Sequence, residues 1–152
     1  MTAKAKKYER IYEQLNKLFE ATPHLPSRMA TAVAVLHHKM PNFYWTGFYL
    51  LEEGQLLVNV YQGTLACQKL QQNVGVCWAA INREEVVIVD DVHQFEGHIA
   101  CSSQTNSEIV LPFYHNGKII GCLDVDSKEF ANFDEEDAKG LERILKLITD
   151  KK

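Results

Sequence analysis

A cysteine in a strongly polar stretch is the first residue whose surroundings point to chemistry. Cys101 lies within GHIACSSQTNSEIV, residues 97–110, among Ser, Gln, Thr and Asn side chains. A free cysteine is most often a small buried hydrophobic residue, whereas a thiol among polar groups is accessible and can react as a thiolate. Cys67 lies in a second polar stretch, residues 62–74. The sequence therefore predicts two accessible thiols.

Acidic residues near the end of a predicted strand form the second candidate group. Side chains two residues apart on a strand share a face, so Asp124 and Asp126 point to the same side. Neighbouring carboxylates repel each other unless a cation, a shared proton or water lies between them. The pair indicates a solvated strand end, a clamp for an ammonium group or metal, or a proton donor with a raised pKa. Glu108, at the start of the neighbouring strand, could complete an acidic cluster.

Two aromatic residues are candidates for the wall of a pocket. Trp45 and Tyr49 share a face of one predicted strand by the same alternation. Aromatic residues dominate protein cores, so packing alone would explain them. As walls of a pocket they would hold an apolar or cationic group by burial and cation–π attraction.

The remaining cysteines and two histidines leave several alternatives open. Cys122 lies in an apolar strand and is expected to pack in the core, whereas Cys77, on a short helix, could be core or reactive. His93, His98 and Cys101 suggest zinc, but the chain has no Cys-x-x-Cys pair and matches no common zinc spacing. We therefore expect no metal site. The histidines are expected to form loop hydrogen bonds, and either could lower the pKa of the thiol.

The elements that must position these residues follow from hydrophobic periodicity. Apolar residues at helical spacing predict helices over about 4–20 and 27–40, the second capped by Ser27, and a last helix over about 134–150, capped by Asp134. A short helix at 75–83 and five strands are also predicted. The strands are expected at residues 43–51, 55–61, 86–90, 107–114 and 118–127, with turns at Glu53-Gly54 and Asn116-Gly117. This order predicts an α+β fold, with a central antiparallel sheet of about five or six strands and helices packed on one face.

Composition limits the class of protein. The chain has 152 residues, of which 46% are apolar and 24% are charged, as in an ordinary globular domain. The net charge of −4 disfavours nucleic acid as a partner. We expect no membrane span, because no apolar run approaches the length of about 20 residues that a bilayer requires. The N-terminal residues lack the apolar core of a secretion signal, so a reducing, cytoplasmic location is expected.

Longer motifs resemble those of a known family. The run VDDVHQFEGHIACSSQTNSEIVLPF, together with GCLDVDS and FDEEDAKGLE, resembles the free methionine-R-sulfoxide reductases, small enzymes of the GAF fold. The specific features are GHIAC with Glu108 seven residues after Cys101, the Asp-x-Asp strand end, and cysteines at positions 67, 77 and 101. The resemblance runs from about Trp45 to the last helix and implies a single GAF domain over residues 1–152.

The resemblance implies a thiol mechanism. Cys101 would be the nucleophile that attacks the sulfoxide sulfur and becomes a sulfenic acid as methionine leaves. Cys67 would resolve this sulfenic acid as a disulfide, which thioredoxin would reduce, and Cys77 would be a further resolving thiol. Because the electrons come from thiols, the resemblance implies no bound metal, flavin or nicotinamide.

The same resemblance gives roles to the other candidates. At least one carboxyl group of Glu108, Asp124 and Asp126 would stay protonated and supply a proton as the sulfoxide oxygen leaves as water. The remaining negative charge would bind the α-ammonium group of the substrate. Trp45 and Tyr49 would pack against its thioether end. Such a pocket would favour free methionine-R-sulfoxide over a methionine sulfoxide residue within a protein.

Two other functions stay open at this point. A non-catalytic GAF module could bind a small effector and use Cys101 as a redox sensor, although such modules usually accompany an output domain, which we do not expect in 152 residues. A structural or interaction protein is disfavoured by two long loops that each carry a cysteine. The resemblance also makes a homodimer the expected assembly, and the two leading helices could pair two chains.

Overall fold

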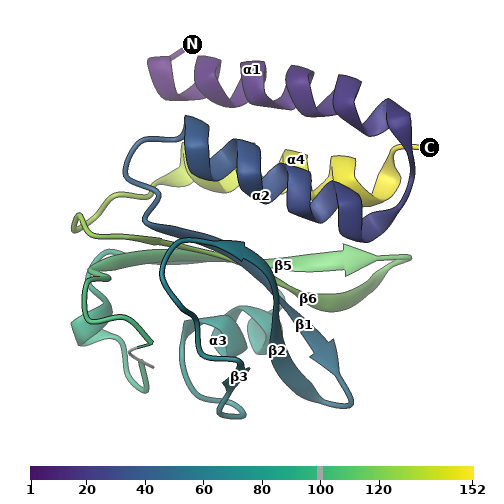
Figure 1. Ribbon diagram of the computed structural model, residues 1–152. Helices are drawn as coiled ribbons and strands as arrows, with labels where there is room; N and C mark the ends of the chain where they lie inside the picture. The colour runs from purple at the N-terminus through teal and green to yellow at the C-terminus, as the bar shows by residue number, and fades with distance from the viewer. Residues whose placement is uncertain (99–100) are drawn as a thin grey trace.

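An antiparallel sheet forms the centre of the molecule. The computed structural model describes residues 1–98 and 101–152, and within them the sheet has six strands in the order β3-β2-β1-β6-β5-β4 (Figure 1). The strands are β1 (Trp45–Glu52), β2 (Gln55–Gln62), β3 (Lys69–Leu70), β4 (Val87–Val89), β5 (Ser107–His115) and β6 (Lys118–Ser127). The five predicted strands are confirmed. The sixth, β3, has only two residues, too few to show a periodic pattern in the sequence.

Helices lie on both faces of this sheet. Figure 1 shows α1 (Ala3–Leu18), α2 (Leu25–Lys39) and α4 (Glu135–Asp150) on one face and α3 (Val76–Arg83) on the other. The sequence analysis placed all helices on one face, but α3 buries Val76 and Trp78 in a second apolar cluster on the opposite face. Two 3-10 turns, η1 (Phe19–Ala21) and η2 (Val92–Gln94), complete the described elements. None of the helices in the described ranges is long and apolar enough to cross a membrane.

The main core lies between the sheet and the three helices on its first face. Each of these helices buries an apolar stripe at the spacing that the sequence showed. The buried helical residues include Tyr8, Ile11, Leu15, Met29, Val33, Leu36, Leu141, Ile144 and Ile148, and the sheet contributes Phe48, Ile109, Leu111, Phe113, Leu123 and Val125. This layer holds β1, β6 and β5 rigidly from one side and leaves the other face of these strands for the site.

The helix ends follow local capping rules, with one correction. Asp134 caps α4 and forms a capping box with Asp137, as the sequence predicted for the cap. The prediction that Ser27 caps the second helix is wrong, because α2 begins at Leu25 with His24 as its N-cap. Pro26 lies in the first turn, where its missing N–H leaves no helical hydrogen bond unmade.

The two predicted hairpin turns are confirmed by the backbone. Glu53 and Gly54 join β1 to β2 with φ values of 50° and 79°, and Asn116 and Gly117 join β5 to β6 with φ values of 53° and 76°. Two consecutive residues with positive φ make the tight turn whose twist matches antiparallel strands. The turns therefore fix the register of both hairpins.

A buried arginine ties the ends of the helical layer together. Arg28 of α2 is only 3% exposed. Its guanidinium donates hydrogen bonds to the backbone carbonyl oxygens of Phe19, Thr22, Ile148 and Lys151, at 2.6–3.1 Å. Carbonyl groups at helix ends lack partners within the helix, and Arg28 supplies the donors that they need.

We expect Arg28→Leu to lower the free energy of unfolding by about 3 kcal/mol, because buried carbonyl groups would lose charged donors. Chemical denaturation measures this change. Arg10→Leu is the matched control, since Arg10 is exposed on α1, and its effect should stay within about 0.5 kcal/mol. Equal effects of the two substitutions would show that Arg28 does not hold the helix ends.

Candidate active site

Strand register brings the predicted site residues onto one face of the sheet. Trp45 of β1 pairs with Asp126 of β6, and Asp126 pairs in turn with Glu108 of β5. Asp124 lies two residues before Asp126 and therefore points to the same side. Paired residues of antiparallel strands have their side chains on the same face, and this is the face that α3 covers. The predicted acidic cluster is thus formed by β5 and β6, with the aromatic strand beside it.

A cavity of about 50 Å³ lies between this face, α3 and the loops that carry Cys67 and Cys101. Its lining contains all the predicted site residues except Cys67, which is bonded to a lining residue. The lining residues include Trp45, Tyr49, Cys77, His98, Cys101, Thr105, Glu108, Asp124 and Asp126. Residues from six separate segments of the chain therefore meet at one place.

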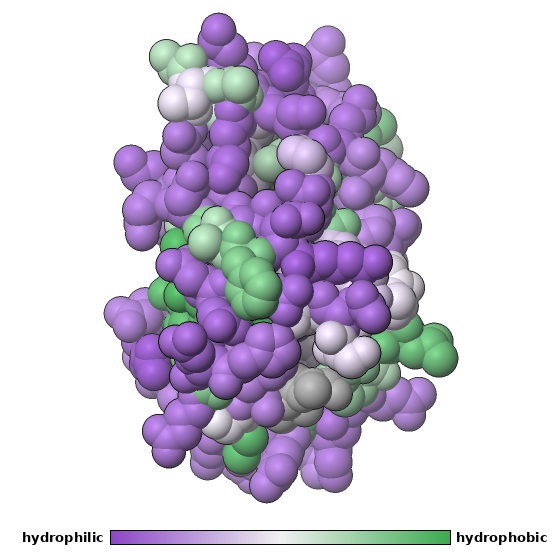
Figure 2. Space-filling view, turned by 90° about the vertical axis from the view of Figure 1, so that its left-hand side faces the viewer, coloured by the Kyte–Doolittle hydropathy of each residue, from purple (hydrophilic) through white to green (hydrophobic). Residues whose placement is uncertain are grey.

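A disulfide joins Cys67 to Cys101 at the edge of the cavity. The two Cα atoms are 5.5 Å apart, and the bond links positions separated by 34 residues. Both cysteines are half-buried, and the neighbouring Leu65, which also lines the cavity, is 85% exposed. The left-hand side of the molecule in Figure 1, which Figure 2 shows, is mainly hydrophilic with separate hydrophobic patches. The GHIAC residues Ile99 and Ala100 lie outside the described residues.

The three carboxyl groups lie close together, and the pKa of each is raised. Glu108 and Asp124 are each 6% exposed. Burial, and then the charges of Asp124 and Asp126, raise the pKa of Glu108 well above its ordinary value, and burial also raises the pKa of both aspartates. Nε2 of His98 is 3.9 Å from Glu108. Burial, and then the charge of His93, lower the pKa of His98, while the charge of Asp124 acts in the opposite direction.

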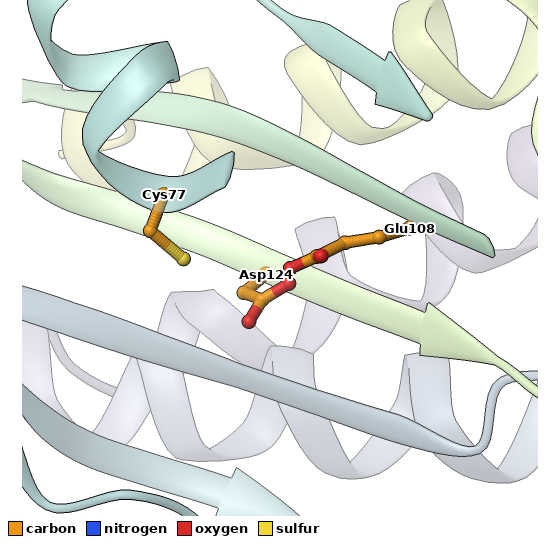
Figure 3. Close-up of side chains that lie close together, drawn as sticks. All are labelled: Cys77, Glu108 and Asp124. Carbon is orange, nitrogen blue, oxygen red and sulfur yellow. The ribbon is translucent and has the colours of Figure 1, made fainter. Parts of the chain in front are cut away.

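Cys77 points from α3 into the acidic cluster. Figure 3 shows its sulfur directed toward Asp124 and Glu108, and one ligand atom of each residue lies within 4.8 Å of the others. Cys77 is 4% exposed. A hydrogen bond with Cys122 and burial raise the pKa of the Cys77 thiol well above its ordinary value. Cys122 is fully buried, as predicted. The role of Cys77 as a further resolving thiol stays a prediction.

The two aromatic residues also hold the loop that carries Cys67. The ring of Trp45 stacks between those of Tyr49 and Tyr61, with ring centroids 5.9 and 5.2 Å apart. Nε1 of Trp45 donates a hydrogen bond to the carbonyl oxygen of Thr64 at 3.0 Å, and the hydroxyl of Tyr49 donates one to that of Cys67 at 3.0 Å. The pocket wall and the position of Cys67 are therefore fixed by the same side chains.

Gly47 is a positioning residue that the sequence analysis did not single out. It lies between Trp45 and Tyr49 on β1 and pairs with Asp124. A Cβ atom here would lie 2.4 Å from Cβ of Tyr61 and 2.6 Å from Cη2 of Trp45. Only glycine lets the aromatic rings close over this strand, and a glycine within an aromatic strand is the signal that could have revealed it.

His93 has the role that the sequence predicted for it. Its Nε2 forms a hydrogen bond with Oδ1 of Asn106 at 2.9 Å, and its backbone N–H donates to Asp91. The amide nitrogen of Asn106 in turn donates to the carbonyl oxygen of Lys128. His93 therefore fixes the start of β5 from outside the cavity.

Comparison with known proteins agrees with this fold and site. Residues 28–150 match the model of the GAF domain family. The fold and site together thus define a GAF domain whose pocket combines cysteines with buried acids. The chain is 44% identical to GAF domain-containing protein A of Dictyostelium discoideum, over 96% of this chain and 92% of that protein.

Two further relatives identify a more specific family within the GAF domain proteins. The free methionine-R-sulfoxide reductase of Escherichia coli is 38% identical, over 91% of this chain and 84% of that enzyme. The crystal structure of the free methionine-R-sulfoxide reductase from Neisseria meningitidis with its substrate has a TM-score of 0.91 and 35% identity, and the match covers 97% of this chain and 89% of that one. The chain belongs to the free methionine-R-sulfoxide reductase family.

The raised pKa of Glu108 makes stability depend on pH. Below the unfolded pKa of about 4.3 both states carry the proton. As pH rises above this value the unfolded chain ionises first, so the free energy of unfolding falls until the raised folded pKa is reached. Glu108→Gln keeps the shape and removes this ionisation. We expect the variant to be more stable than the parent at pH 8, and the gain to shrink toward pH 4, because only the parent bears the cost of ionising or protonating this buried group.

Denaturation at pH 4 and pH 8 tests this expectation. Glu52→Gln is the control, because Glu52 is exposed at the end of β1, and it should change stability equally at both pH values. A parent protein that is more stable at pH 8 than at pH 4, with no gain from Glu108→Gln, would contradict a protonated Glu108.

Proposed function

We propose that this chain reduces free L-methionine-R-sulfoxide to L-methionine. The observation that carries the proposal is the Cys67–Cys101 disulfide beside a cavity lined by three buried carboxyl groups. Family membership supports the choice of substrate, because the relatives from Escherichia coli and Neisseria meningitidis bear this activity in their names. The chemistry then follows from the groups around the cavity.

The two cysteines would carry the redox steps. The Cys101 thiolate attacks the sulfoxide sulfur, the oxygen passes to Cys101 as a sulfenic acid, and methionine leaves as a thioether. The Cys67 thiol then attacks the Cys101 sulfur, and the oxygen leaves as water while the disulfide forms. In sum, one sulfoxide and two thiols give one thioether, one disulfide and one water. The disulfide state corresponds to the end of this sequence.

The acidic cluster would supply the proton and bind the substrate. A carboxyl group that keeps its proton near neutral pH can donate to the sulfoxide oxygen, and the raised pKa of Glu108 and Asp126 suits them to this role. Asp124 would share the negative charge that attracts the α-ammonium group. A methionine sulfoxide residue in a protein has an uncharged amide nitrogen and would lose this attraction. Trp45 and Tyr49 would enclose the thioether end.

Reduction of the disulfide would complete the cycle. We propose thioredoxin as the electron donor, the cytoplasm as the location, no bound cofactor, one GAF domain over the whole chain, and a homodimer through the leading helices.

The cavity of about 50 Å³ is small for the substrate. Breaking the bond between the two loops would let them separate, so the pocket would admit substrate only in the reduced state. Formation of the disulfide would then help to expel methionine.

Turnover with the two sulfoxide epimers tests the proposed reaction. The protein is incubated with thioredoxin, thioredoxin reductase, NADPH and either the R or the S form of free methionine sulfoxide. We expect sustained NADPH oxidation with the R form alone. Cys101→Ser should abolish it, and Cys67→Ser should stop after one methionine per chain unless Cys77 replaces the missing thiol. Cys122→Ser is the control and should retain turnover.

The alternative function gives a different result in this assay. A redox-sensing GAF module would consume one equivalent of oxidant per chain and would show no sustained NADPH oxidation with either epimer. Sustained turnover with the S form only, or full turnover by Cys101→Ser, would also overturn the proposed reaction.

The hydrogen bond from Tyr49 to Cys67 should matter for the second step only. Tyr49→Phe keeps the ring in the pocket wall but releases the Cys67 carbonyl. We expect release of the first methionine at the normal rate and a several-fold slower appearance of the disulfide, because the Cys67 loop is no longer held in place. Single-turnover measurements of methionine and free thiols resolve the two steps.

Tyr61→Phe is the matched control, since Tyr61 stacks on the same Trp45 ring. It should leave both steps unchanged. If Tyr49→Phe slows methionine release as much as disulfide formation, the hydroxyl acts on the substrate and not on the loop.

A further inference from the structure

We propose that Cys77, Glu108 and Asp124 form a binding site for one divalent cation of the zinc class. One sulfur atom and two carboxylate oxygens from these residues lie within 4.8 Å of one another. The three residues come from α3, β5 and β6, and Figure 3 shows their side chains directed toward a common point. No sequence motif predicts this site, because positions 77, 108 and 124 are far apart along the chain.

The spacing of the donor atoms suits such an ion. Zinc binds sulfur at about 2.3 Å and carboxylate oxygen at about 2.0–2.2 Å, so neighbouring ligand atoms in a tetrahedral site lie about 3.3–3.6 Å apart. The three atoms lie within 4.8 Å of one another, so rotations of the side chains that shorten these distances by roughly 1–1.5 Å or less would reach this spacing. The cavity that they line, about 50 Å³, is large enough for an ion and one or two water molecules.

A buried oxygen without a hydrogen-bond donor points independently to a ligand. Oδ1 of Asp124 has no donor within the described part of the chain, and the residue is 94% buried, with 6% of its surface exposed. Oδ1 of Asp126, beside it, also lacks a donor among the described residues. Buried carboxylate oxygens need a proton or a cation. A metal ion in contact with Asp124 would meet this need, and the protons that it displaces from Cys77, Glu108 and Asp124 would pass to solvent as it binds.

The ligand types select the class of ion. Calcium and magnesium prefer ligand sets made only of oxygen, whereas the Cys77 sulfur favours zinc, cobalt or cadmium. Three protein ligands leave a fourth position of the tetrahedron for water or for Asp126.

A bound cation would act on the same groups that the reaction needs. Given the reductase function proposed above, an ion on Glu108 and Asp124 would replace the proton that the sulfoxide oxygen requires and would repel the α-ammonium group. The occupied chain would therefore be inactive, and the site would make the activity sensitive to free zinc.

Titration of the disulfide form with cobalt tests the site without any use of activity. In this form Cys77 and Cys122 are the free thiols, so absorption from a cobalt–thiolate bond reports on these two residues alone. We expect one cobalt ion per chain, with a thiolate-to-cobalt charge-transfer band that zinc displaces. Cys77→Ser should remove the band, and Asp124→Asn should weaken binding at least about tenfold.

Cys122→Ser is the matched control, because Cys122 is buried next to Cys77 but is not among the proposed ligands. It should keep the band. The site is overturned if folded wild-type protein shows no thiolate band at millimolar cobalt, if the band survives Cys77→Ser, or if Cys122→Ser removes it. Should Cys77→Ser fail to fold, unchanged affinity in Asp124→Asn overturns the site on its own. If no cobalt binds, the metal site is excluded and the proposed reductase function is unaffected. If the enzyme shows no reductase activity, the cobalt titration still tests the metal site.

Discussion

Three carboxyl groups lie together on one face of the sheet, and the arrangement of the strands and loops around them follows from the need to keep them there. Each group would be better solvated in water, and each raises the cost of ionising its neighbours. Glu108, Asp124 and Asp126 stay together because β5 and β6 pair along nine positions and cannot separate without losing the main core. The outcome is a set of acids whose pKa values are raised above those of water-exposed carboxyl groups.

The two faces of the sheet divide stability and chemistry between them. On one face three helices bury a continuous apolar core, and Arg28 satisfies carbonyl groups where the helices end. On the other face a single short helix and two cysteine loops cover the strands, and polar groups there include Asp124 and Asp126 oxygens that lack donors within the described residues. Unsatisfied buried groups cost stability, so the helical face must offset what the site face loses.

The aromatic residues link the pocket to the cysteine chemistry. Trp45 and Tyr49 form a wall of the cavity, and their polar atoms hold the backbone of the loop that carries Cys67. The rings that would contact a substrate are therefore the same rings that hold the Cys67 loop in position. Gly47 makes the arrangement possible, because any side chain at this position would overlap the ring of Trp45.

The local structure could be predicted from the sequence, because caps, turns and periodic burial act over a few residues. Asp134 at the start of α4 and Asn116-Gly117 between β5 and β6 are examples. The shared face of Asp124 and Asp126 follows from strand alternation in the same way. Which segments meet depends on long-range packing. The placement of α3 on the second face, and with it the direction of Cys77 toward the acids, depends on apolar contacts between residues far apart in the chain, which no local pattern records.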